Sequence, residues 1–187
     1  KIKIVKESST DNRLEYSIVK IEPYPFQEEI LRKLEADRAH GRRRNLVVSA
    51  TGTGKTIISA IDYRRYISKN QGKKNRLLFI AHRKEILERS LVTFRMVLQN
   101  RNFGELLTGD EVPQNYDHLF ATIQSLKKIY DHVAEDYFDY IVVDEVHHGA
   151  ADSYERPLTY FKPDILLGLT ATPERMDGQD ITRFFLE

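Results

Sequence analysis

A short run rich in glycine and threonine, residues 49–56 with the sequence SATGTGKT, carries the strongest chemical signal in this chain. Gly52 and Gly54 let the backbone turn tightly and point its N–H groups inward, which forms a nest for an anion. Lys55 can then reach terminal phosphates, and the Thr56 hydroxyl suits Mg²⁺. The run departs from the general phosphate-loop pattern at its first position, where serine replaces glycine. We interpret it as a nucleotide-phosphate site. The alternative is a flexible turn that only caps a helix.

Two carboxylates follow an apolar run later in the chain. Asp144 and Glu145 come directly after residues 140–143. Asp144 can hold Mg²⁺ through water, and Glu145 can orient and deprotonate an attacking water. A surface acidic turn is the alternative, which the phosphate loop makes less favoured. His147 and His148 come next, but adjacent side chains diverge and make a poor zinc pair, so we do not expect a zinc site.

The elements that must position these residues alternate along the chain. Near-continuous apolar runs are typical of strands that are buried on both faces of a parallel sheet. They occur at residues 46–48, 77–80, 119–121, 140–143 and 165–167. Helical stripes lie between them at residues 30–34, 57–63 and 87–98. This alternation predicts an α/β fold with a mostly parallel central sheet and helices on both faces, with both chemical motifs at the carboxyl edge.

The composition excludes several classes of protein. The chain has 187 residues, no cysteine and a net charge of +1. The absence of cysteine argues against a disulfide scaffold and against a thiolate zinc site. No apolar run approaches the roughly 18 residues of a membrane span, and we expect a cytoplasmic location. Residues 1–20 alternate in polarity and predict an arm or small hairpin ahead of one domain at 21–187. The arginine run at 42–44 favours a solvated surface over a binding patch.

The motifs together resemble those of superfamily-two helicases of the DExH type. Residues 50–56, 144–147 and 170–173 resemble motifs I, II and III of that family, which also tolerates serine at position 49. Residues 25–27, 80–83 and 122–125 resemble its glutamine motif, motif Ia and a later motif that faces nucleic acid. Residues 170–178 resemble the branch that is related to the helicase subunit of type III restriction enzymes.

This resemblance implies a RecA-like ATPase domain, the first of two, that uses ATP and Mg²⁺. Its implied catalytic residues are Lys55, Asp144 and Glu145, and its implied metal-binding residues are Thr56 and Asp144. The nucleotide-binding residues would be Gln27, which reads adenine, and Thr51, Gly52, Thr53, Gly54, Lys55 and Thr56. Contacts to nucleic acid would come from Arg83, Thr122, Gln124 and Ser125. His147, Thr170 and Thr172 would couple hydrolysis to movement. Tyr24 and Phe26 pack either near the base or in the core.

Two functions remain open from the sequence. The first is the motor domain of a helicase or translocase, with a second RecA-like domain as partner. Its family branch favours DNA as the nucleic acid, while the residues themselves leave DNA and RNA both open. The second is a nucleotide-binding scaffold that does not act on nucleic acid. The intact Lys55, Asp144 and Glu145 favour the enzyme. The family resemblance implies that the second domain supplies an arginine finger, worth about 10³–10⁵ in rate in related phosphoryl-transfer systems. We therefore expect ATP binding but little turnover from these residues alone.

Overall fold

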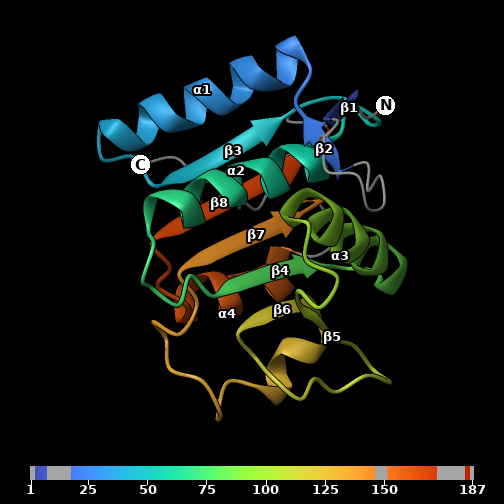
Figure 1. The fold of residues 1–187 in the computed structure, drawn as a ribbon. Coiled ribbons are helices and arrows are strands. Elements are labelled where there is room, and N and C mark those ends of the chain that lie inside the picture. The colour runs from blue at the N-terminus through green and yellow to red at the C-terminus, as the bar shows by residue number, and fades with distance from the viewer. Residues whose placement is uncertain (1–2, 8–17, 146–150, 172–183, 186–187) are drawn as a thin grey trace.

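A computed structural model describes residues 3–7, 18–145, 151–171 and 184–185 (Figure 1). In this part of the chain, one sheet has six strands in the order β3-β8-β7-β4-β6-β5, and every neighbouring pair is parallel. The predicted parallel α/β fold is therefore confirmed. The strands are β3 (Arg44–Val48), β4 (Leu77–Ala81), β5 (Glu105–Leu107), β6 (His118–Thr122), β7 (Tyr140–Asp144) and β8 (Ile165–Thr170).

Helices cover both faces of this sheet. The helices are α1 (Pro25–Ala39), α2 (Lys55–Lys69), α3 (Lys84–Leu98) and α4 (Ala151–Tyr160), with a 3₁₀ turn η1 (Ser125–Lys128). Figure 1 shows α2 and α3 in front of the sheet, α4 behind it, and α1 beyond the β3 edge. Three of the parallel connections return the chain to the same end of the sheet through a helix: α2 joins β3 to β4, α3 joins β4 to β5, and α4 joins β7 to β8.

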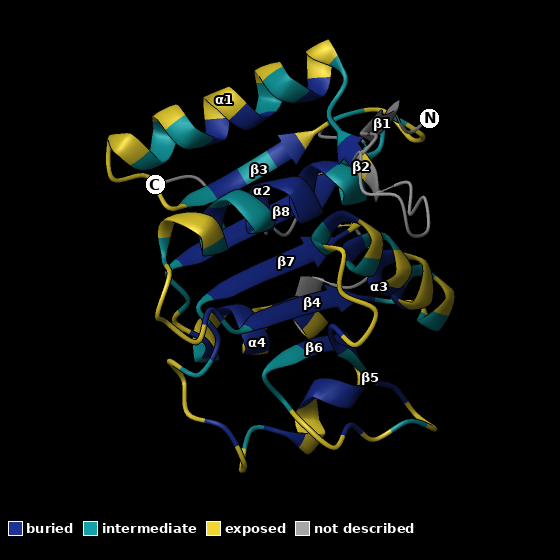
Figure 2. Ribbon diagram, in the orientation of Figure 1, coloured by how far each residue is buried: buried dark blue, intermediate teal, exposed yellow. Residues whose placement is uncertain are grey.

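The core has two layers, one on each face of the sheet. Successive strand residues face opposite sides, so Phe79 packs with the helices α1 to α3 and Ile80 with η1 and α4. The central strands β4, β7 and β8 are buried along their whole length (Figure 2). This burial explains why the sequence reads there as continuous rather than alternating apolar runs.

Two elements, β5 and α4, were not foreseen from the sequence. Strand β5 has only three residues, and α4 contains Pro157, which weakens a helical pattern. Strands β1 (Lys3–Glu7) and β2 (Ile18–Glu22) pair antiparallel as a separate two-stranded sheet. Within the described residues, every helix is too short or too polar to cross a membrane.

Candidate nucleotide-binding site

The loop that joins β3 to α2 has the backbone shape of an anion nest. Gly52 and Gly54 have φ angles of 82° and 83°, in the left-handed region that favours glycine. Gly54 is also the residue that caps α2 at its N-terminus. A Cβ atom at Gly54 would lie 2.7 Å from the Gln27 amide nitrogen. Glycine is therefore required there both for the turn and for the close approach of α1.

Side chains within the loop hold its shape. The Ser49 hydroxyl donates to the Thr53 hydroxyl at 2.8 Å, and Thr53 donates to the Ala50 carbonyl at 2.7 Å. The Lys55 ammonium donates to the carbonyls of Ser49 and Ala50 at 2.8 and 3.2 Å. Serine at position 49 thus contributes a structural bond that glycine would lack. The lysine lies across the loop on neutral acceptors, which bind it less strongly than an anion would.

Gln27 connects α1 to this loop. Its side chain is 2% exposed, and its oxygen accepts the Tyr24 N–H at 2.9 Å. Its amide nitrogen donates to the Thr53 carbonyl, also at 2.9 Å.

The neighbouring residue Phe26 is 47% exposed, and its ring stacks on Tyr24 with the ring centroids 6.2 Å apart, so Phe26 is not a core residue. The sequence had left that question open.

The predicted carboxylates lie at the same edge of the sheet as the phosphate loop. Asp144 ends β7 and pairs with Leu169 of β8, while Val48 of β3 pairs with Thr170 of β8. Only β8 therefore separates the loop from Asp144, which corresponds to about 10 Å between the outer strands. Asp144 is 7% exposed.

Local contacts fix the backbone around the two carboxylates. The Asp144 carboxylate accepts the Glu145 N–H at 2.9 Å. Glu145 is exposed and has a φ of 54°, which is uncommon for a residue other than glycine. Burial, with the nearby charges of Asp144 and Glu145, raises the pKa of Tyr154, whose hydroxyl donates to the Asp144 carbonyl at 3.4 Å. A positive φ at a residue other than glycine, as at Glu145, commonly marks a functional position.

The predicted coupling residues are only partly described. Thr170 ends β8 and is 1% exposed, and its carbonyl accepts the Ser49 N–H at 3.0 Å. One backbone bond therefore joins the third motif directly to the start of the phosphate loop. His147 and Thr172 lie outside the described residues.

The predicted nucleic-acid residues fall into two groups. Arg83, next to the start of α3, and Gln124 are exposed. Thr122 and Ser125 are 8% and 4% exposed, and their hydroxyls bond each other at 2.8 Å. These two side chains fix the turn after β6. The Gln124 amide lies 3.5 Å from the His82 ring, which adds His82 to the same surface. The sequence did not single out His82, because only strand register brings β4 and β6 together there.

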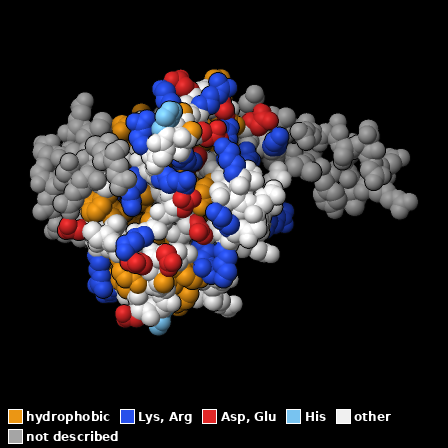
Figure 3. Space-filling model, turned by 90° about the vertical axis from the view of Figure 1, so that its left-hand side faces the viewer, with side chains coloured by type: hydrophobic (Ala, Val, Ile, Leu, Met, Phe, Trp, Pro, Cys, Tyr) orange, Lys and Arg blue, Asp and Glu red, His pale blue; other side chains and the backbone are white. Residues whose placement is uncertain are grey.

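The arginine run at residues 42–44 lies at the opposite end of the strands, and two of its side chains form ion pairs. Arg42 pairs with Asp37 at 2.9 Å, and Arg43 pairs with Asp164. Figure 3 shows acidic side chains among the basic ones on this face.

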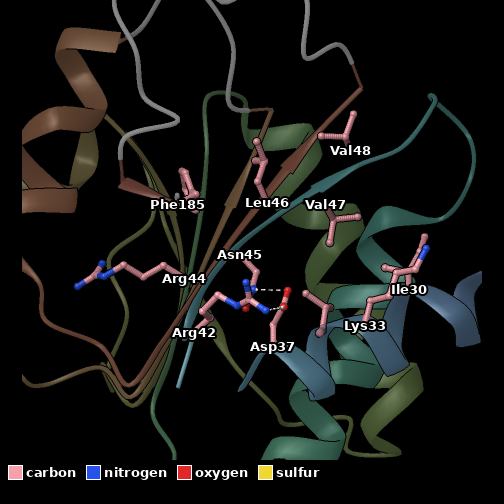
Figure 4. A pocket seen from close by; sticks show the side chains of 11 residues that line it. Ile30, Lys33, Asp37, Arg42, Arg44, Asn45, Leu46, Val47, Val48 and Phe185 are labelled. Carbon is pink, nitrogen blue, oxygen red and sulfur yellow. Dashed lines mark hydrogen bonds and ion pairs between the residues drawn. The ribbon is translucent and has the colours of Figure 1, made fainter. Parts of the chain in front are cut away.

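A groove of about 510 Å³ runs beside β3 (Figure 4). In its lining, the Asp37 carboxylate pairs with Arg42 and accepts a hydrogen bond from the Asn45 amide. The groove is lined by none of the predicted site residues. The described residues also contain no group of three or more acidic or histidine side chains placed to hold a metal.

Comparison with known proteins identifies the family. Residues 20–175 match the family described as "Type III restriction enzyme, res subunit". The chain belongs to this family. The resemblance to superfamily-two helicases and the RecA-like assignment are thereby confirmed, and the match extends over the phosphate loop, the acidic strand end and Thr170.

Individual relatives agree with this assignment. The EcoAI type I restriction enzyme endonuclease subunit of Escherichia coli is 32% identical over 87% of this chain and 21% of its own length. Irc3 of Schizosaccharomyces pombe, whose name assigns it to the mitochondrial ATP-dependent helicases, is 31% identical over 84% of this chain and 27% of its own length. The type ISP restriction-modification enzyme LlaGI, solved with a DNA substrate mimic, shares the fold at a TM-score of 0.61. It is 18% identical over 81% of this chain and 18% of its own length.

Proposed function

We propose that this chain is the ATP-binding motor domain of a nucleic-acid-dependent ATPase, a helicase or translocase that acts on DNA. The observation that carries the proposal is the placement of the phosphate loop and the Asp144–Glu145 pair at one edge, with one strand between them. The chain spans 21% and 27% of the length of two relatives. The activity of the whole protein is therefore part of the proposal. A second RecA-like domain would complete the site, and the cytoplasm is the compartment that we propose.

The loop residues fit a nucleoside triphosphate with Mg²⁺. Backbone N–H groups of the loop and of the first turn of α2 would hold the phosphates, and the Lys55 ammonium would exchange its two carbonyl acceptors for phosphate oxygens. The Thr56 hydroxyl and Asp144 would hold Mg²⁺, the latter through water. The metal would neutralise charge that develops on the phosphates.

Gln27 retains the hydrogen-bonding capacity that adenine recognition needs. A primary amide has two N–H donors and an oxygen with two lone pairs. The bonds to Tyr24 and Thr53 use one of each. The remaining lone pair can accept the adenine amino group, and the remaining N–H can donate to a ring nitrogen of the base. Guanine presents a carbonyl where adenine has its amino group, so the same arrangement disfavours GTP.

Glu145 would act as the general base. Its exposed carboxylate lies next to Asp144 and can orient and deprotonate the attacking water. Thr170 would couple hydrolysis to movement through its bond to Ser49, as would His147 and Thr172 in the family motifs. Arg83 and Gln124 would contact the phosphate backbone of DNA, which positions the strand without reading its sequence. Thr122 and Ser125 would support that contact by fixing the turn.

ATP binding by the 187-residue chain tests the nucleotide site. Lys55→Ala removes the bonds from the ammonium to the phosphates, so we expect ATP affinity to fall roughly 10- to 100-fold, the scale of bonds to charged groups. Calorimetric titration with ATP and Mg²⁺ measures this fall. The matched control is Lys33→Ala, which removes an exposed lysine on α1 whose partner is Glu29. Equal ATP affinity in the wild type and in Lys55→Ala would contradict the assignment.

The scaffold alternative is tested separately with nucleic acid. A motor domain should bind DNA at low salt and lose affinity as salt rises, because phosphate contacts release counterions. Fluorescence anisotropy with a labelled duplex and a labelled single strand measures this dependence. Arg83→Ala should lower the affinity for the duplex and the affinity for the single strand by the same factor. Absence of binding at the lowest salt would favour the scaffold.

A further inference from the structure

A buried charged cluster lies at the other end of α1 from Gln27. The Arg38 guanidinium donates to both oxygens of the Asp62 carboxylate, at 2.7 and 2.6 Å. Asp62 lies on α2 and is 0% exposed. The Tyr140 hydroxyl of β7, also 0% exposed, donates to the same carboxylate. Three elements therefore meet at one carboxylate: α1, α2 and the strand that carries Asp144.

This cluster is better suited to fixing geometry than to adding stability. A buried ion pair repays little of its desolvation cost, whereas a planar two-bond fork is satisfied in only one orientation. Among the described residues, the Nε atom of Arg38 is buried without a hydrogen-bond partner, which adds to that cost. The pKa of Tyr140 is raised by burial and by the Asp62 charge, so its hydroxyl stays a donor.

Helix α1 depends on polar contacts for its attachment. Its buried residues are Gln27, Leu31 and Leu34. Further contacts with α2 are ion pairs at its surface, such as those from Glu28 to Arg65 at 2.7 Å and from Glu35 to Lys69 at 3.3 Å. The apolar contacts of α1 with the core come from Leu31, Leu34 and the partly buried Ile30. The directional bonds at its two ends add a constraint on the angle of the helix that apolar packing alone does not give.

The two buried polar contacts lie near opposite ends of this helix. Gln27 and Arg38 are eleven residues apart, which is about 16 Å along a helix. Gln27 contacts the phosphate loop, and Arg38 contacts α2 two turns after Lys55. Helix α2 thus begins at the phosphate loop and also carries the carboxylate that anchors α1. A rotation of α1 about Gln27 is resisted by the fork at Arg38.

We propose that Arg38 is a positioning residue for adenine selection. Through Asp62 and Tyr140 it fixes the angle of α1, and thereby holds the Gln27 amide against the phosphate loop with one donor and one acceptor directed to the base. This inference rests on the proposed ATP site. It adds that nucleotide preference depends on a cluster that contacts no nucleotide.

Nucleotide preference in Arg38→Lys tests the proposal. Lysine keeps the charge but has no planar fork, so α1 should lose its fixed angle. We expect the ratio of ATP to GTP affinity to fall about 3- to 10-fold, the scale of one or two hydrogen bonds. Calorimetric titration of the 187-residue chain with ATP and with GTP, each with Mg²⁺, gives that ratio. The control is Lys69→Met, which removes an α1–α2 ion pair at the surface and should leave the ratio unchanged.

Two further variants separate positioning from a structural role. In a Gln27→Ala background, Arg38→Lys should not change the ratio further, because the amide that it positions is gone. Tyr140→Phe keeps the ring and removes one bond to Asp62, so it should lower the ratio less than Arg38→Lys and provides the test if that variant does not fold. A lower melting temperature with an unchanged ratio in both variants would overturn the proposal. A wild-type chain that binds ATP and GTP equally would overturn it too, while one that binds neither contradicts the proposed function and this inference with it.

Discussion

Gln27 shows how packing inside the protein occupies the polar atoms of a predicted site residue. A sequence pattern predicts that a glutamine here faces adenine, but it does not show that the same amide bonds to Thr53. That bond depends on α1 and the phosphate loop meeting in three dimensions. Thr122 and Ser125 are a second case, since both were predicted as contacts and are largely buried against each other. Residue types indicated the site, while tertiary packing decides which atoms remain available.

His118 gives a prediction at this scale. Burial lowers its pKa below the ordinary 6.5, while Asp117 raises it and Arg76 lowers it. Its ring stacks on Phe103 at 4.5 Å, with the Tyr63 hydroxyl 3.5 Å away. In the unfolded chain this histidine binds a proton near pH 6.5, whereas in the folded chain it binds the proton only at lower pH. The free energy of unfolding should therefore fall as the pH drops below 6.5.

Urea unfolding at a series of pH values from 7.5 to 5.5 measures this dependence of the free energy of unfolding on pH. His118→Gln should flatten the slope, and exposed His132→Gln should not. If the free energy of unfolding had the same slope against pH in the wild type and in His118→Gln, the prediction would be wrong.

Elements with strong local signals were predictable, and weak ones were not. The strands β3, β4, β6, β7 and β8 contain continuous apolar runs, so the sequence indicates their position. It also indicates the full burial of β4, β7 and β8, but not the edge position of β3, where Val48 is 45% exposed. Strand β5 has three residues and depends on β6 for its pairing. Helix α4 contains a proline. A local pattern cannot supply what such elements obtain from their neighbours.

Strand β8 makes a prediction at the scale of elements. It passes between β3 and β7, and a Cβ atom at Gly168 would lie 2.7 Å from a Leu46 methyl and 2.9 Å from the Phe185 ring. Gly168→Ala should therefore destabilise the domain by about 1–3 kcal/mol through overpacking, measured by thermal unfolding. The matched control is Gly109→Ala, since a Cβ there would meet no atom within 4 Å. Equal melting temperatures for the two variants would show that the core yields at β8.

At the scale of the whole molecule, the charges do not divide the surface as they divide the sequence. Residues 1–100 carry 22 basic and 11 acidic side chains, which suggests one basic half. The parallel sheet interleaves early and late segments, with β8 lying next to β3. Ion pairs such as Arg43–Asp164 then join the two halves of the sequence. Without a dominant positive field, the affinity of this domain alone for nucleic acid should be weak.

The catalytic rate of this chain is the prediction that belongs to the whole molecule. Lys55, Asp144 and Glu145 all lie near the carboxyl edge of the sheet, and we propose that a second RecA-like domain closes over this edge. An arginine finger in related phosphoryl-transfer systems is worth about 10³–10⁵ in rate. The 187-residue chain should therefore bind ATP yet hydrolyse it at close to the background rate, with or without DNA. Phosphate release under saturating ATP and Mg²⁺ measures this, and Glu145→Gln sets the background. A robust rate that DNA stimulates and that Glu145→Gln abolishes would mean that this chain needs no group from a second domain.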